Sequence, residues 1–132
     1  MRPVSDLAAM LAQLSPTRRP GTYVFVTVPG PPDPSLHPVM TFTEDEGRTL
    51  VLERGEADRA HLAYDLVTAW ITLTVHSALD GVGLTAAVSG ALAGAGISCN
   101  VVAAAFHDHL FVPARSADDA LRVLRELSVQ SR

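Results

Sequence analysis

The sequence predicts an α+β fold in which helices cover one face of an antiparallel sheet. From residue 70 onward, the segments follow the order strand, helix, strand, strand, helix, which is a split βαβ arrangement without its last strand. The segment that begins at Ser116 has apolar residues at helical spacing with charged residues between them, as expected for a helix packed on a sheet.

The first half of the chain carries a helix pattern followed by strand patterns. Pro16 ends the first helix because proline cannot continue a helix, and Gly47 supplies the positive φ that a hairpin turn needs. A proline-rich loop, residues 29–34, follows the first strand. The predicted elements are a helix over 5–14, a strand over 23–28, hairpin strands over 39–43 and 49–53, and a short helix over 56–62.

The second half begins with a strand whose residues alternate in polarity. Ile71, Leu73 and Val75 share one face, and threonines and a histidine occupy the other. A helix of small residues follows and ends before Gly96, which suits a left-handed cap. The predicted elements are a strand over 66–76, a helix over 84–95, strands over 97–104 and 110–113 joined by a turn over 106–109, and a helix from 116.

The second half lacks the strand that would complete its sheet. The C-terminal residues 128–132 are too few and too polar to provide it. An open sheet edge attracts another strand, so either the first half or another subunit must supply one. We expect completion within the chain.

Composition excludes several partner classes. The net charge is −4, and the ten basic residues are all arginines dispersed along the chain, so no basic patch for nucleic acid is present. The longest apolar stretch, 82–97, is broken by four glycines and is shorter than a membrane span, which predicts no membrane contact. The lone Cys99 excludes an internal disulfide. We therefore expect a cytoplasmic protein, and the arginine-rich, lysine-free composition is typical of a bacterial source.

The turn between residues 79 and 85 is the best candidate site. Gly81 and Gly83 allow a ligand to approach backbone N–H groups closely, and the N-terminus of the following helix favours a carboxylate. Asp80 either caps that helix or receives a ligand ammonium group, and the two roles are compatible. Ser77, one residue past the strand, points toward the same crevice.

These residues resemble the ACT domain family. The run Asp80-Gly81-Val82-Gly83-Leu84, the helix, and the exit Ala95-Gly96-Ile97-Ser98 match an ACT domain over residues 70–127, although Val82 stands where a proline is frequent. The whole chain is similar to bacterial proteins with two fused ACT-like halves, and its layout resembles aspartate kinase regulatory domains and cytosolic arginine sensors. The segments 40–47 and 107–113 carry this second likeness.

The resemblance implies two ferredoxin-like (βαββαβ) ACT halves, with antiparallel sheets and helices on one face. Residues 1–66 would form a divergent N-terminal half and residues 67–132 a C-terminal ACT domain. No glycine turn is visible in the first half, for which we expect a mainly architectural role. ACT domains are amino-acid-binding regulatory modules, so the resemblance implies an amino-acid ligand.

The predicted ligand-binding residues are Ser77, Asp80, Gly81, Val82, Gly83, Leu84 and Asn100. Asn100 is included because it interrupts an apolar strand and its amide needs a hydrogen-bond partner. We expect Cys99 to pack in the core rather than act as a nucleophile. His107 and His109 have a spacing that allows a metal, but a polar turn with Asp108 is favoured. We predict no catalytic residues, no metal and no cofactor.

The leading hypothesis is a non-enzymatic, allosteric regulatory protein that binds a free amino acid or similar small metabolite and forms a homodimer. The alternative is a structural or protein-interaction module that keeps the ACT fold and binds no ligand. The hydrophobic content of 48%, the small-residue helix and the incomplete second half favour the homodimer. An enzyme built on the two histidines is the third and weakest hypothesis.

Overall fold

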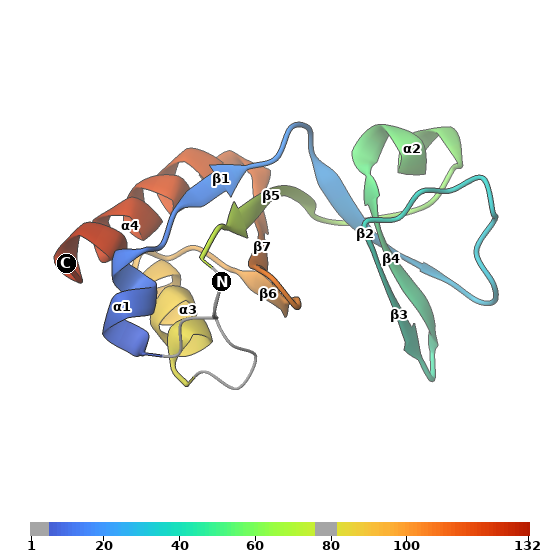
Figure 1. Ribbon diagram of the computed structural model, residues 1–132. Coiled ribbons are helices and arrows are strands. Elements are labelled where there is room, and N and C mark those ends of the chain that lie inside the picture. Colours follow the sequence, from blue (N-terminus) through green and yellow to red (C-terminus); the bar gives the residue numbers. More distant parts are fainter. Residues whose placement is uncertain (1–5, 76–81) are drawn as a thin grey trace. The chain divides into compact units, whose positions relative to one another are not determined.

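The computed structural model describes residues 6–75 and 82–132 (Figure 1). The chain folds into two compact units. The composite unit combines the N-terminal segment up to Pro20 with Ala69–Arg132, and the inserted unit is Gly21–Thr68. These units are defined by contacts in space. The predicted halves, residues 1–66 and 67–132, are consecutive segments of the sequence, and this division stays a prediction.

The inserted unit is a small antiparallel sheet with one short helix. The strand order is β3-β4-β2-β5, with β2 antiparallel to both β4 and the first residues of β5. Its core consists of Val24, Val26, Leu50, Leu52 and Ala57. Its elements are β2 (Tyr23–Val28), β3 (Met40–Glu44), β4 (Gly47–Glu53), α2 (Arg54–Arg59) and the start of β5 (Val67–Leu73).

The composite unit is a sheet of order β1-β5-β7-β6 packed on helices. The helices cover one sheet face, because Ile71 and Leu73 on β5 and Leu110 on β7 share a single buried cluster with residues of α1, α3 and α4. Its elements are α1 (Leu7–Ala12), β1 (Pro16–Arg18), the remainder of β5, α3 (Leu84–Gly94), β6 (Asn100–Ala103), β7 (Asp108–Pro113), the 3-10 turn η1 (Ala114–Ser116) and α4 (Ala117–Gln130).

Strand β1 completes the sheet of the composite unit. Its three residues pair antiparallel with Ile71–Leu73 of β5, and the N–H of Arg19 extends the ladder by donating to the Trp70 carbonyl at 2.8 Å. Pro16 is tolerated because a proline without an N–H fits at a sheet edge. The expectation that the first half supplies the missing strand is confirmed. The sequence pattern did not indicate a strand at residues 16–18.

Both units use the strand order of the ferredoxin-like fold. In each, the first and third strands of the βαββαβ order lie in the centre, which confirms the predicted fold class. Strand β5 serves twice, since residues 67 and 68 close the inserted sheet and residues 69–73 open the composite one. The inserted unit departs from the pattern between β2 and β3, where residues 29–39 form a loop in place of the first helix.

The remaining predicted elements are present with shifted ends. The first helix is shorter than expected, at Leu7–Ala12, and α2 begins two residues early, at Arg54. Gly96 has a φ of 75° and follows α3 as predicted. Asp108 is the first residue of β7 and is only 7% exposed, so the expectation that it forms the turn is wrong.

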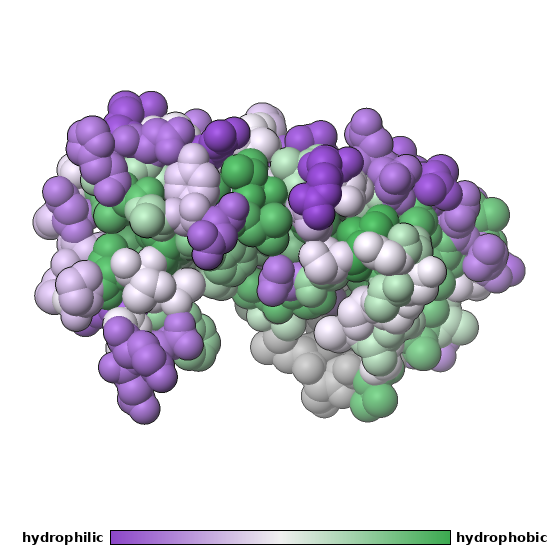
Figure 2. Space-filling model, turned by 180° about the vertical axis from the view of Figure 1, so that it is seen from behind, coloured by the Kyte–Doolittle hydropathy of each residue, from purple (hydrophilic) through white to green (hydrophobic). Residues whose placement is uncertain are grey.

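The surface of the described residues is mixed. Green hydrophobic and purple hydrophilic residues alternate over the face drawn in Figure 2. Large apolar side chains that reach solvent include Phe42, Val82, Phe106 and Val129. Within residues 6–75 and 82–132, no helix has the length and apolar character needed to cross a membrane.

Candidate functional site

The turn that leads into α3 has the backbone conformation of a glycine turn. Gly83 occupies the N-cap position with φ 101° and ψ −13°, a left-handed conformation that side-chain-bearing residues rarely adopt. Leu84, which follows, is 5% exposed and anchors the helix start in the core. Val82, which precedes it, is 82% exposed. The turn therefore has a buried anchor on one side and an open surface on the other.

The start of α3 is able to accept an anion. The first N–H groups of an α-helix have no acceptor within the helix, and the helix dipole adds positive potential there. No described side chain caps this end, since Gly83 has none to offer. Three predicted contact residues, Ser77, Asp80 and Gly81, lie outside the described residues, so their part in the turn stays a prediction.

Asn100 lies away from this turn. It is the exposed first residue of β6 and pairs with Phe111 of β7. The turn is at the N-terminal end of α3, and β6 follows the C-terminal end of that helix. Eleven residues of helix span roughly 16 Å at 1.5 Å per residue. The structure thus brings Val82, Gly83 and Leu84 together and leaves Asn100 near the opposite end of α3.

A polar cluster occupies the sheet face opposite the helices in the composite unit. The Trp70 Nε1–H donates to His109 Nδ1 at 3.1 Å, and the Thr72 hydroxyl lies 3.2 Å from the same nitrogen. Arg19 donates through Nε to Thr72 Oγ1 at 3.0 Å, and its guanidinium lies 5.0 Å from the Trp70 ring centroid. These contacts fasten the end of β1 to β5 and β7.

This cluster favours the neutral form of His109. Nδ1 accepts the tryptophan N–H, so the ring proton resides on Nε2. Burial is the main cause that lowers the pKa of His109, and the positive charge of Arg19 adds to it. Burial raises the pKa of the neighbouring Asp108 carboxyl. Among the described residues, no group of three His, Cys, Asp or Glu side chains is arranged to hold a metal ion.

Cys99 is half-buried against the core of the composite unit. Burial raises the pKa of its thiol to about 11, so the thiolate that nucleophilic chemistry requires is scarce at neutral pH. The geometry agrees with a packing role.

The inserted unit contains a cavity that the sequence patterns did not indicate. The cavity has a volume of about 750 Å³ and lies between the proline-rich loop and α2. Glu56 and Arg59, three residues apart on α2, contribute the charged groups of its helical wall. This spacing places two side chains on one helix face, and it was the signal available in the sequence.

The family comparisons identify the class of protein. One ACT domain model matches residues 2–69, and another matches residues 66–126. The chain belongs to the ACT domain family and consists of two ACT domains in tandem. ACT domains are regulatory modules, which defines the class of this chain.

Several solved structures are similar to this chain over most of its length. A Vibrio cholerae protein of unknown function, described as a possible transport protein, is 47% identical, with a TM-score of 0.85 over 92% of this chain and 95% of that one. An Agrobacterium tumefaciens protein has 18% identity and a TM-score of 0.68, covering 87% of this chain and 89% of its own. The ligand-free regulatory subunit of Thermus thermophilus aspartate kinase has 12% identity and a TM-score of 0.64, with coverage of 85% and 95%. Among curated proteins, none matches the sequence.

Proposed function

We propose that this chain is a non-enzymatic regulatory protein that binds a free amino acid or a similar small metabolite at the turn before α3. The observation that carries the proposal is Gly83, whose left-handed backbone directly precedes a helix that no described side chain caps. Membership of the ACT domain family supports it, since these domains are regulatory modules.

In this proposal the ligand carboxylate accepts hydrogen bonds from the N–H groups at the start of α3, where the helix dipole stabilises a negative charge. Gly81 and Gly83 keep the approach free of side chains. Asp80 and Ser77 face the ligand's ammonium group. We leave Asn100 out of this contact set, because it lies near the other end of α3.

The regulatory step in this proposal is a change of arrangement in a cytoplasmic homodimer. A ligand shifts the equilibrium between two arrangements of the dimer only if it binds one arrangement more tightly than the other. One arrangement must therefore offer the ligand more contacts. The exposed, small-residue surface of α3 supports contact with a second copy, since Cβ atoms at Gly90 and Gly94 would meet nothing within 4 Å in this chain. Light scattering at micromolar concentration tests the dimer, and a mass of one chain refutes it.

The ligand is tested by thermal shift against the twenty amino acids, followed by calorimetry on any hit. A ligand at 100 times its dissociation constant adds about 2.7 kcal/mol of stability. A flat screen with folded protein overturns the proposal and favours an interaction module instead.

The position of the site is tested with Val82→Asp. The new carboxylate lies beside the turn and repels a ligand carboxylate, and about 1.4 kcal/mol of repulsion weakens binding tenfold. Val129→Asp is the matched control, because Val129 is 61% exposed near the end of α4 and has the same side chain. Equal affinities for the two variants place the ligand elsewhere.

A further inference from the structure

The cavity of the inserted unit occupies the place of a helix that this unit lacks. In the ferredoxin-like order a helix connects the first two strands, but here residues 29–39 between β2 and β3 form a loop that contains five prolines. Val28, Leu36 and Leu62 consequently remain only partly buried against the core, and they line the cavity. Its volume of about 750 Å³ lies within the range of small-molecule sites, roughly 300–1,000 Å³.

The loop wall of this cavity is built before any ligand arrives. Asp33 Oδ1 accepts from both the N–H and the hydroxyl of Ser35 at 2.9 Å, and the Leu36 N–H donates to the Asp33 carbonyl at 3.0 Å. Prolines on either side fix φ and restrict the chain further. The N–H of His37 donates to Glu56 Oε1 at 3.0 Å, which fastens the end of the loop to α2.

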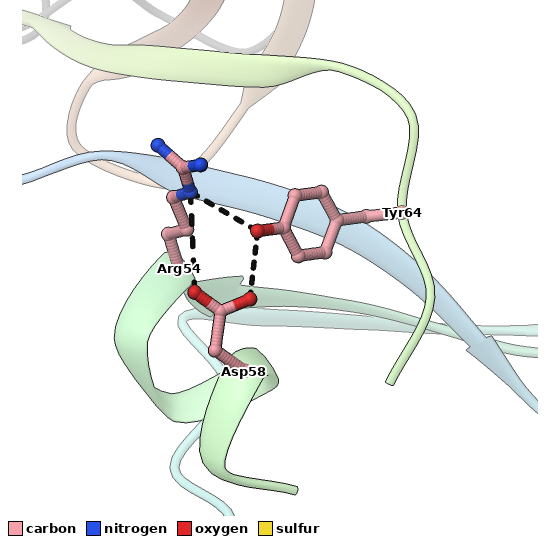
Figure 3. A network of polar contacts seen from close by, with 3 residues as sticks. All are labelled: Arg54, Asp58 and Tyr64. Atoms are coloured by element: carbon pink, nitrogen blue, oxygen red, sulfur yellow. Dashed lines mark hydrogen bonds and ion pairs between the residues drawn. The ribbon is translucent and has the colours of Figure 1, made fainter. Parts of the chain in front are cut away.

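The wall on the other side of the cavity, formed by α2 and the segment that follows it, is also held by hydrogen bonds. Figure 3 shows Tyr64 between Arg54 and Asp58 of α2: its hydroxyl accepts from Arg54 Nε at 3.0 Å and donates to Asp58 Oδ1 at 2.7 Å. The Leu62 N–H donates to the Ala57 carbonyl at 3.0 Å. The segment after α2 is thereby tied to that helix, and it holds Leu62 in the cavity wall.

The charges in the cavity suit a zwitterion. Glu56 and Arg59 lie one turn apart on α2, yet among the described residues neither forms an ion pair. One Glu56 oxygen is used by the His37 N–H, which leaves the other for a ligand. Both side chains also line an adjoining cavity of about 240 Å³, so the pair stands between two open spaces. The pair presents a cation and an anion side by side above an apolar floor.

We propose that this cavity binds an α-amino acid with an apolar side chain. The ligand carboxylate pairs with the Arg59 guanidinium, whose planar fork matches a carboxylate, and its ammonium group pairs with Glu56. The side chain packs on Leu36 and Leu62. This site lies within the inserted unit and is independent of the turn before α3.

The first experiment measures binding of L-leucine to the full chain by calorimetry. We expect leucine to bind and two analogues to bind at least tenfold more weakly: 4-methylpentanoate, which lacks the ammonium group, and 3-methylbutylamine, which lacks the carboxylate. No heat up to about 10 mM leucine, or equal affinity for an analogue, overturns the proposal.

The second experiment locates the leucine with variants. Arg59→Gln and Glu56→Gln should each weaken binding at least tenfold, and the glutamine at 56 retains an oxygen for the His37 N–H. Arg125→Gln, at an exposed arginine on α4 without an ion pair to any described residue, is the matched control and should bind normally. Val82→Asp should also retain this binding. Loss in Val82→Asp with retention in Arg59→Gln overturns the proposal and supports the turn instead.

Gly55→Ala separates binding from folding. A Cβ at Gly55 would lie 3.3 Å from Arg59 Nη1, so alanine makes a tight contact that the guanidinium, the mobile end of a long side chain, relieves by moving a few tenths of an ångström. Alanine is also the better helix former, so the melting temperature should stay equal or rise. Weaker leucine binding in a protein of unchanged or raised stability is the expected result, and unchanged affinity contradicts the role of Arg59.

Discussion

The composite unit should be unable to fold without the first twenty residues of the chain. The perturbation is a fragment, Ala69–Arg132, that removes α1 and β1. The rest of this unit would then keep α3, α4 and three strands but lose the strand beside β5 and the helix beneath it.

The expected loss is comparable to the stability of a whole domain. Met10, Leu11 and Leu14 are 0%, 9% and 4% exposed and belong to the cluster that packs on the sheet. Burial of one such side chain is worth about 1.5–3 kcal/mol, so the three together contribute about 5–9 kcal/mol. Domains have a net stability of about 5–15 kcal/mol. The newly exposed edge of β5 also favours aggregation.

A permuted fragment is the matched control, and circular dichroism with urea is the assay. In this control, Ala69–Arg132 continues through a flexible linker of about ten residues into residues 6–20. The Ser128 hydroxyl donates to the Ala12 carbonyl at 3.2 Å, so the end of α4 lies beside the end of α1. The six residues of α1 add about 9 Å to reach its start, and a linker of this length spans about 16–19 Å. We expect a cooperative transition only in the permuted fragment. Equal midpoints for the two fragments would refute the role of α1 and β1.

Four further substitutions follow from the local structure. Gly83→Ala should destabilise the protein by about 1–3 kcal/mol, because φ is 101° and a Cβ would lie 3.0 Å from Leu7 Cδ2. Gly90→Ala should stabilise the protein by up to about 1 kcal/mol, because a Cβ there would meet nothing within 4 Å and alanine is the better helix former. Urea denaturation compares the two variants. The pKa of His109 is lowered on folding, so stability should fall as the pH drops below about 6.5, and less so in His109→Gln. The pKa of Asp108 is raised on folding, so the stability of the protein should fall as the pH rises above about 3.9. Asp108→Asn should therefore be more stable than the native protein at pH 7 but not at about pH 3. Melting temperatures measured across pH test the predictions for both His109 and Asp108.

Most strands and helices could be predicted because their residues carry a strong local pattern. The strand at 23–28 and the helix that begins at Leu84 have strong periodicity and clear ends. Strand β1 has neither, since three residues with a proline at one end carry no periodicity, and only its pairing with β5 makes it a strand. The order of the elements indicated that a strand was missing, but no residue pattern indicated which segment supplies it.

The same distinction applies to the candidate sites. The turn at Gly83 was predictable because glycine readily adopts the positive φ that a tight turn before a helix requires. The separation of Asn100 from that turn also follows from the sequence, because the helix expected over 84–95 lies between them and places the two at its opposite ends. A substitution at Gly83 would disturb folding as well as binding, because its φ is 101°, so the exposed Val82 is the better position for a test of binding. The cavity of the inserted unit arises from an absent helix, and the spacing of Glu56 and Arg59 in the sequence marks one of its walls but not the cavity itself.

The order in which the composite unit is assembled has a consequence for its synthesis. Residues of α1 and β1 leave the ribosome early, while α4, which packs against both, is made near the end. At about 5–20 residues per second, the roughly 100 residues between β1 and α4 take about 5–20 s to synthesise. Until α3 and then α4 are made, Met10, Leu11 and Leu14 lack the helices that cover them, and the segment is open to chaperones and proteases. A nascent chain stalled before Ala117 should therefore remain sensitive to proteolysis within its first twenty residues, even after the inserted unit has folded.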